Sequence, residues 1–326
     1  MHRPEDRHGI RQGKLLSEIN VGIYRAYSRA WRRLPLFRGK VRTAKELRRL
    51  LGLENHHIFE SVTLNQPISY KAILDLHGWL EFIAYFTGGY EADTVEFLVK
   101  CYNNNGYFLD VGANIGLISV PFSIMMNSTS TRTATSVYSI EAVNSNHERL
   151  QQNIEINGLL EQIVAINCGV AECEKTVEIQ VEGNLRDGEG TGTANILADN
   201  TDHPAERISL DVTTIDKLID ADVLADQCCL MKIDLDGYDL KALQGASSLL
   251  SLSRPVIFGE FSAYCLKWHG QTHQDVENHM RTFDYEVFYR SKDSWHFSRN
   301  CKQDGDLLIL PVEKLSDFTW CTESAS

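Results

Sequence analysis

The spacing of apolar residues divides the chain into three parts. Between residues 14 and 34, large apolar residues recur every three or four positions with arginines between them, which predicts a basic amphipathic helix. From about residue 56, short runs at 58–64 and 69–74 flank a Gln66-Pro67 turn and predict two strands. Residues 78–100 then predict a turn and a helix. The apolar stripe of the first helix consists of Leu15, Leu16, Ile19, Ile23, Tyr27, Trp31 and Leu34.

From residue 107 onward, short apolar runs alternate with amphipathic stretches. This pattern of repeated β-loop-α units predicts a mainly parallel sheet covered by helices. Runs at 107–111, 136–140 and 164–167 predict the first three strands. A helix over 145–157, closed by Gly158, joins the second strand to the third. Further on, 176–181 and 207–213 predict antiparallel strands around a glycine-rich loop, 183–194, which we interpret as a cover over a site.

Composition and charge narrow the class of protein. The chain has 326 residues, 43% of them hydrophobic and 23% charged, as expected for one large or two ordinary globular domains. A net charge of −12 argues against a nucleic-acid binder. No apolar stretch approaches the roughly 20 residues of a membrane-spanning helix, the N-terminus lacks the apolar core of a signal peptide, and the eight cysteines form no CxxC pair. We therefore expect a cytoplasmic protein with reduced thiols.

The charge is distributed unevenly along the chain. Residues 1–50 contain 14 basic and 4 acidic residues, a net charge of +10, which leaves 18 basic and 40 acidic residues, a net charge of −22, for residues 51–326. The chain thus predicts a basic arm, residues 1–55, on an acidic body. Two uses of the arm stay open: its apolar stripe packs on the body, or residues 14–34 make a peripheral contact with an anionic membrane or a partner protein.

The first motif with chemical meaning ends the strand at 107–111. Asp110 precedes a turn of small residues that leads into a helix, and such a turn lets a ligand approach backbone N–H groups closely. Only two glycines are present, four apart, so the G-x-G-x-x-G fingerprint of a dinucleotide site is missing, which argues against a nicotinamide dehydrogenase. The turn consists of Gly112, Ala113, Asn114 and Gly116.

A second motif lies at the ends of the next two strands. Glu141 ends the second strand, 29 residues after Gly112. In a doubly wound sheet, an acid at this point accepts hydrogen bonds from the hydroxyls of a ribose. The third strand leads into Gly169-Val170, where an adenine ring can lie against backbone and apolar side chains. Together with Asp110 and the glycine turn, these residues predict a nucleoside pocket.

The third motif is a cluster of carboxylates. A buried strand in the run that starts at Met231 ends in Asp234, Asp236 and Asp239, and Glu260 ends the next strand on the same edge of the sheet. Crowded carboxylates raise one another's pKa, which suits a proton acceptor or a cation site. Both uses stay open here, the second as a Mg²⁺ ion held by Asp234, Asp236 and Glu260.

At this point the chain resembles the FkbM-type S-adenosylmethionine-dependent methyltransferases. The stretches 108–116, 139–141 and 231–260 match the family in order and spacing, and Gly89-Tyr90-Glu91 and Thr214-Ile-Asp216 are further landmarks. The resemblance covers about residues 85–311, so we expect a methyltransferase domain at 56–326 behind the extension at 1–55. Asp236 departs from the glutamate usual in the family, and Ala142 from the usual proline.

The resemblance implies a class I methyltransferase (Rossmann-like) α/β fold. Its seven-stranded, mostly parallel sheet has helices on both faces, and residues 286–290 and 306–311 fit the final two strands. The implied reaction is in-line methyl transfer from S-adenosylmethionine, most often to a hydroxyl, and a sugar, glycan or natural-product-like small molecule is the expected acceptor. A binding or scaffold protein on the same frame stays open as the alternative.

The resemblance also implies a role for each site residue. The methionine part of the cofactor would lie near Asp110, Gly112 and Asn114, the ribose on Glu141, and the adenine near Gly169 and Val170. The cofactor-binding set further includes Glu91, Ala113, Gly116 and Asp234. Because positioning supplies most of the catalysis, one proton acceptor suffices.

We expect that acceptor to be Asp234, at the tip of the fourth strand, with Glu260 second. Two interpretations stay open for His269 and His273: they reach over the pocket, or they are solvated loop residues. The acceptor pocket would be shaped by segments 56–90, 183–194 and 262–274. Two uses stay open for Trp79, Tyr90 and Tyr264: they form an aromatic floor for a sugar or lipid, or they pack in the core.

Overall fold

A computed structural model describes residues 7–129, 137–181, 194–196, 206–292, 294–299 and 305–322. The predicted glycine-rich cover lies outside these residues, apart from its last residue, Ala194. No helix in the described ranges combines the length and apolar character needed to span a bilayer.

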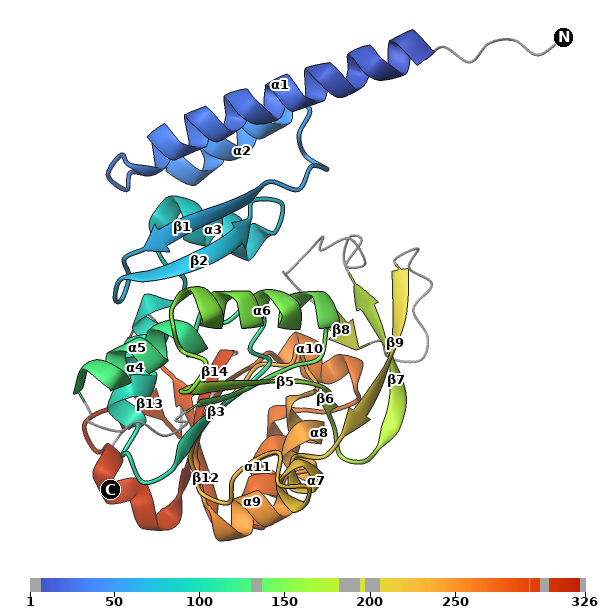
Figure 1. The fold of residues 1–326 in the computed structure, drawn as a ribbon. Coiled ribbons are helices and arrows are strands. Elements are labelled where there is room, and N and C mark those ends of the chain that lie inside the picture. The colour runs from blue at the N-terminus through green and yellow to red at the C-terminus, as the bar shows by residue number, and fades with distance from the viewer. Residues whose placement is uncertain are drawn as a thin grey trace, which may run out of the picture.

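Eight strands form the central sheet in the order β13-β12-β14-β11-β10-β3-β4-β5 (Figure 1). The strands β5, β4, β3, β10 and β11 run parallel, and β14 is inserted antiparallel between β11 and β12. This is the strand order of a class I methyltransferase. The strands are β3 (Tyr107–Val111), β4 (Val137–Glu141), β5 (Ile163–Asn167), β10 (Cys228–Ile233), β11 (Val256–Phe261), β12 (Tyr285–Arg290), β13 (Phe297–Ser298) and β14 (Gly305–Pro311).

The seven expected strands are confirmed, and the two-residue β13 adds an eighth at the edge. Alternate residues of each strand face opposite sides, so the sheet builds two cores. Phe108 of β3 belongs to the core under the helices α4 to α6, whereas Leu109 and Val111 belong to the core under α7 to α11. These helices are α4 (Ala92–Cys101), α5 (Ser119–Thr129), α6 (Asn144–Ile156), α7 (Ile215–Asp220), α8 (Asp239–Gln244), α9 (Ser247–Leu252), α10 (Ala263–Trp268) and α11 (His273–Arg281), and the described chain ends after the 3₁₀ helix η2 (Val312–Phe318).

A smaller four-stranded sheet, in the order β6-β9-β7-β8, lies beside the central sheet (Figure 1). The antiparallel pairing of β7 with β9 confirms the sequence prediction. Val177 and Val212 of this sheet share a small core with Tyr238, which follows β10. The second sheet is therefore fixed close to the carboxyl end of the first. Its strands are β6 (Gly169–Val170), β7 (Lys175–Val181), β8 (Ala194–Ile196) and β9 (Glu206–Thr213).

The N-terminal region forms an outer layer on the domain. Helices α1 (Arg7–Arg32) and α2 (Lys40–Leu50) lie against a hairpin of β1 (Phe59–Leu64) and β2 (Tyr70–Asp75), which is followed by α3 (Trp79–Thr87) (Figure 1). The hairpin is joined in turn to α6. The side chains of Asn153 and Asn157 accept backbone hydrogen bonds from Ile73 and Lys71, at 2.8 Å each.

The amphipathic helix is present, but its packing face differs from the predicted stripe. Tyr24 is fully buried and its hydroxyl donates to the carbonyl of Ala44, while Arg25 and Arg29 pair with Glu60 of β1 at 3.2 and 3.0 Å. With the helix held in this orientation, Ile19 and Ile23 of the predicted stripe face solvent and are 49% and 51% exposed. Leu34 lies beyond the end of the helix and is 44% exposed.

Candidate functional site

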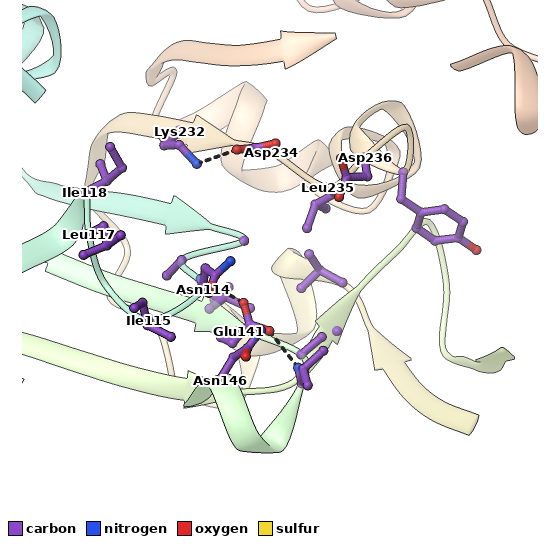
Figure 2. Close-up of a pocket in the computed structure, with 18 of the residues that line it drawn as sticks. Asn114, Ile115, Leu117, Ile118, Glu141, Asn146, Lys232, Asp234, Leu235 and Asp236 are labelled. Atoms are coloured by element: carbon purple, nitrogen blue, oxygen red, sulfur yellow. Dashed lines mark hydrogen bonds and ion pairs between the residues drawn. The ribbon is translucent and has the colours of Figure 1, made fainter. Parts of the chain in front are cut away.

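A cavity of about 370 Å³ opens at the carboxyl ends of β3, β4 and β10 (Figure 2). Its walls come from the turn after β3, the end of β4, strand β6, the turn after β10, and α3. Eight of the ten residues expected to bind the cofactor line this cavity; they are Glu91, Gly112, Ala113, Asn114, Glu141, Gly169, Val170 and Asp234.

The other two expected residues support the cavity without lining it. Asp110 is fully buried in β3. Gly116 has a φ of +87°, and a Cβ on it would meet the Leu150 side chain at 2.7 Å, so this glycine lets α6 pack closely on the turn.

The turn after β3 requires glycine at its first position. Gly112 has a φ of +82°, and a Cβ there would lie 2.1 Å from the carbonyl oxygen of Asp234. The N–H groups of Gly112 and Ala113 both donate to the carbonyl of Ile140, at 3.0 and 2.9 Å. The turn is thus held tightly between the ends of β4 and β10, with its backbone at the cavity wall.

Glu141 connects this turn to the end of β4. Its carboxylate accepts hydrogen bonds from the backbone N–H groups of Asn114, at 2.9 Å, and Val143, at 2.8 Å (Figure 2). Burial raises the pKa of Glu141 to about 7. A carboxylate oxygen can accept a second hydrogen bond, so Glu141 can still receive hydroxyl donors from a ligand in the cavity.

A buried lysine that the sequence analysis left without a role organises the acids beside the cavity. The Lys232 ammonium lies 3.2 Å from a carboxylate oxygen of Asp234 and 3.7 Å from one of Asp110. Burial opposes its charge, but Asp234 and Asp110 outweigh burial and raise the pKa of Lys232. Asp110 also accepts a hydrogen bond from the hydroxyl of Ser119 at 2.5 Å. The sequence signal that could have revealed this lysine is a single basic residue inside an otherwise apolar strand.

A second hollow, of about 440 Å³, adjoins the first and shares Glu91, Lys232, Asp234 and Glu260 with it. Arg290 and Asp306, at the ends of β12 and β14, line its far side and pair at 2.5 Å. A ligand in the first cavity would therefore have an open space beside it, bordered by acids.

Four carboxyl groups around the two hollows, here called the pocket carboxyls, have raised pKa values. Burial is the largest cause in each case, and nearby acids add to it for Asp236, Asp239 and Glu260. Asp239 folds the turn after β10 by accepting from the N–H groups of Leu235 and Gly237, at 2.8 and 2.9 Å. The pocket carboxyls are Glu141, Asp236, Asp239 and Glu260, each with a pKa of about 7.

The two carboxylates expected as proton acceptors lie together, but in different surroundings. Asp234 is bound to Lys232, whereas Glu260 faces both hollows and has no ion-pair partner in the described ranges. An acceptor needs an accessible carboxylate with a pKa near the working pH. Glu260 meets both conditions, with a pKa of about 7 and access to both hollows.

The two loop histidines do not reach the site. His269 lines neither hollow; its ring packs edge-on against Tyr238 with 5.1 Å between centroids, and burial lowers its pKa to about 4. The Nε2 of His273 lies 2.6 Å from the carbonyl of Phe261. Of the three aromatic residues considered for a floor, Tyr90 lines the first cavity, while Trp79 and Tyr264 are exposed outside it.

The magnesium site that the sequence left open as an alternative is not formed in the described part of the chain. In the ranges that the structure describes, no three His, Cys, Asp or Glu side chains are grouped in a way that could hold a metal ion. This includes Asp234, Asp236 and Glu260.

The order of the strands and the turn after β3, held between the ends of β4 and β10, define the fold of a class I methyltransferase. A model of the methyltransferase FkbM domain matches residues 110–287, more than half of the chain. The chain therefore belongs to the FkbM methyltransferase family. A search of curated proteins gave no match.

Similar solved structures include three chains of low identity. The methyltransferase FkbM from Methylobacillus flagellatus is 18% identical with a TM-score of 0.40, over 70% of this chain and 52% of that one. Magnesium protoporphyrin IX methyltransferase from Synechocystis, with bound SAM, is 13% identical (TM-score 0.35, 67% and 76% covered). M. jannaschii TYW2 in complex with AdoMet is also 13% identical (TM-score 0.36, 76% and 84% covered). This chain thus spans about half the length of the Methylobacillus protein.

Proposed function

We propose that this protein binds S-adenosylmethionine in the first cavity and transfers its methyl group to a hydroxyl of a sugar, glycan or natural-product-like small molecule. The observation that carries the proposal is the small-residue turn held against Glu141 at the wall of one cavity. The family of the chain supplies the reaction type, and the second hollow beside the cavity supplies room for an acceptor.

The residues of the cavity fit this cofactor. Glu141 would accept hydrogen bonds from the ribose hydroxyls, Gly169 and Val170 would contact the adenine, and the backbone around Gly112 would lie along the methionine part. The volume lies within the usual range for small-molecule sites. An acidic wall that includes Glu91 suits a ligand with a positive sulfonium and ammonium group.

When bound, the cofactor supplies an electrophilic methyl group, and the chain supplies position and a proton acceptor. The second hollow would hold the acceptor hydroxyl beside Glu260, which removes the proton as the oxygen attacks. The Lys232 ammonium holds the Asp234 carboxylate in place at the junction of the two hollows. Asp234 is then part of the electrostatic wall rather than the base.

Calorimetric titration with S-adenosylmethionine and, separately, with NAD tests the cofactor assignment. We expect binding of S-adenosylmethionine only. The variant Glu141→Gln should weaken it at least tenfold, about 1.4 kcal/mol, because one acceptor oxygen becomes an amide. Glu155→Gln, on the exposed face of α6, is the matched control. Binding of neither ligand, or equal binding by Glu141→Gln, would refute the assignment.

Transfer of a labelled methyl group to a panel of hydroxyl compounds tests the reaction. We expect Glu260→Gln to lower kcat with little change in cofactor affinity. We expect Asp234→Asn both to lower kcat and to weaken cofactor binding. Cofactor binding without transfer to any acceptor would favour the scaffold alternative. Transfer to amines alone would refute hydroxyl specificity.

A further inference from the structure

The turn between α1 and α2 carries large apolar side chains that the fold leaves in water. Leu34, Leu36 and Phe37 are 44%, 67% and 44% exposed. Ile19 and Ile23, further back along α1, are about half exposed. Clustered exposure of this kind marks an interaction surface more often than scattered single residues do.

The turn is an ordered structure. The buried Lys40 ammonium donates to the carbonyls of Arg32, at 3.0 Å, and Leu34, at 2.6 Å. The indole N–H of Trp31 donates to the carbonyl of Lys40 at 3.1 Å, and the ring of Phe37 packs edge-on against Trp31. These bonds hold the backbone of the turn in place, so its apolar side chains are presented to solvent by the fold.

Cations surround these apolar side chains. Arg33, Arg38 and Arg42 are exposed, and no ion pair joins them to an acid within the described part of the chain. Residues 1–50 carry a net charge of +10 and the remainder −22. The helices α1 and α2 lie at one end of the molecule, beyond the hairpin and away from the central sheet (Figure 1).

We infer that the α1–α2 turn docks on the surface of an anionic lipid bilayer. Leu34, Leu36 and Phe37 enter the region between head groups and acyl chains, and Arg33, Arg38 and Arg42 lie at the level of the lipid phosphates. Because the body is acidic, the bilayer attracts one end of the molecule and repels the other, which orients it.

Charge favours a bilayer over a second copy of the chain at this surface. Two copies joined through their turns would bring two segments of net charge +10 together, whereas anionic lipids neutralise the same arginines. The inference concerns binding alone and is independent of the proposed methyl transfer.

Vesicle flotation tests the inference with the full-length protein. The probes are vesicles of phosphatidylcholine alone and vesicles with about one-third phosphatidylglycerol, at low and high salt. We expect flotation with the anionic vesicles only, weakened by salt. Leu36→Ser alone and the double variant Leu36→Ser/Phe37→Ser should reduce the bound fraction progressively, the latter at least tenfold.

The matched control is Leu252→Ser, which alters an 83% exposed leucine on α9 of the acidic body and should leave flotation unchanged. Thermal melting of each variant checks that it folds. Absence of flotation with anionic vesicles, or flotation that Leu36→Ser/Phe37→Ser does not reduce, would overturn the inference. A dimer that depends on Leu36 and Phe37, without vesicle binding, would overturn it in favour of a second copy.

Discussion

Replacing Lys232 with methionine tests whether buried electrostatics hold the cavity together. Methionine is close to lysine in length and carries no charge. Lys232 is 6% exposed at its side chain and lies between Asp110, which has no exposure, and Asp234, which is 38% exposed. In Lys232→Met, Asp234 can regain water, but Asp110 is left as a buried carboxylate without a nearby cation, and the Ser119 hydroxyl still donates to it.

The expected loss of stability depends on whether Asp110 stays ionised or takes up a proton. Removing one partner of a buried ion pair costs about 3–5 kcal/mol. Asp110 can limit the cost by taking up a proton, which from an ordinary carboxyl pKa of about 4 costs roughly 4 kcal/mol at pH 7 and about 1.4 kcal/mol at pH 5. A carboxyl with a raised pKa stabilises the fold at low pH and loses that contribution as the pH rises. Lys232→Met should therefore destabilise the protein by about 3–4 kcal/mol at pH 7 and by less than half of that at pH 5.

Urea unfolding followed by circular dichroism at the two pH values measures this difference. The double variant Asp110→Asn/Lys232→Met should recover much of the stability at pH 7, because it removes the buried charge. A loss below about 1 kcal/mol at pH 7 would refute the reasoning, as would a loss that does not change with pH. A double variant no more stable than Lys232→Met would refute the role given to Asp110.

Three further predictions concern the turn after β3, the pocket carboxyls and the N-terminal layer. Gly112→Ala should lower the free energy of unfolding in urea by at least about 3 kcal/mol, because its Cβ would meet the Asp234 carbonyl at 2.1 Å. Gly158→Ala, with a φ of +69° and open space around it, should lower it by about 1 kcal/mol. Equal losses for the two variants would contradict this. The raised pKa values of the pocket carboxyls mean that the fold loses stability as the pH rises through about 7. Between pH 6 and pH 8 the free energy of unfolding should fall by about 1 kcal/mol for each of the two buried members, Glu141 and Asp239, so calorimetry should give a lower Tm at pH 8 than at pH 6. A higher Tm at pH 8 would contradict this. Arg149→Met removes a buried ion pair to Glu81 that joins α6 to α3. It should lower the free energy of unfolding by about 3–5 kcal/mol and speed proteolysis between residues 50 and 90. Unchanged cleavage in this range would contradict the idea that the pair holds the N-terminal layer on the domain.

The parallel core of the fold could be predicted from the sequence because its strands are buried on both faces. Such strands appear as continuous apolar runs, as at Tyr107–Val111, and their polar ends mark the carboxyl edge of the sheet. Glu141 was found in this way. The edge strand β13 could not be predicted, since two residues are too few to show a period.

Other features depend on contacts between distant segments. Tyr24 and Glu60 decide which face of α1 is buried, and no local pattern reveals that choice. The role of Lys232 depends on the register that sets it beside Asp110. His269 follows Glu260, the second candidate for the base, closely in sequence. Its ring nevertheless packs against Tyr238, and only the packing of the loop determines this.

The central claim is that the first cavity binds a nucleoside cofactor with its ribose on Glu141. A crystal structure of the protein with S-adenosylhomocysteine tests this most directly. The account predicts both ribose hydroxyls within hydrogen-bond distance of Glu141, the adenine against Gly169 and Val170, and the sulfur toward Asp234 and the second hollow. A ligand bound elsewhere, or one whose adenine lies toward Asp234, would contradict it.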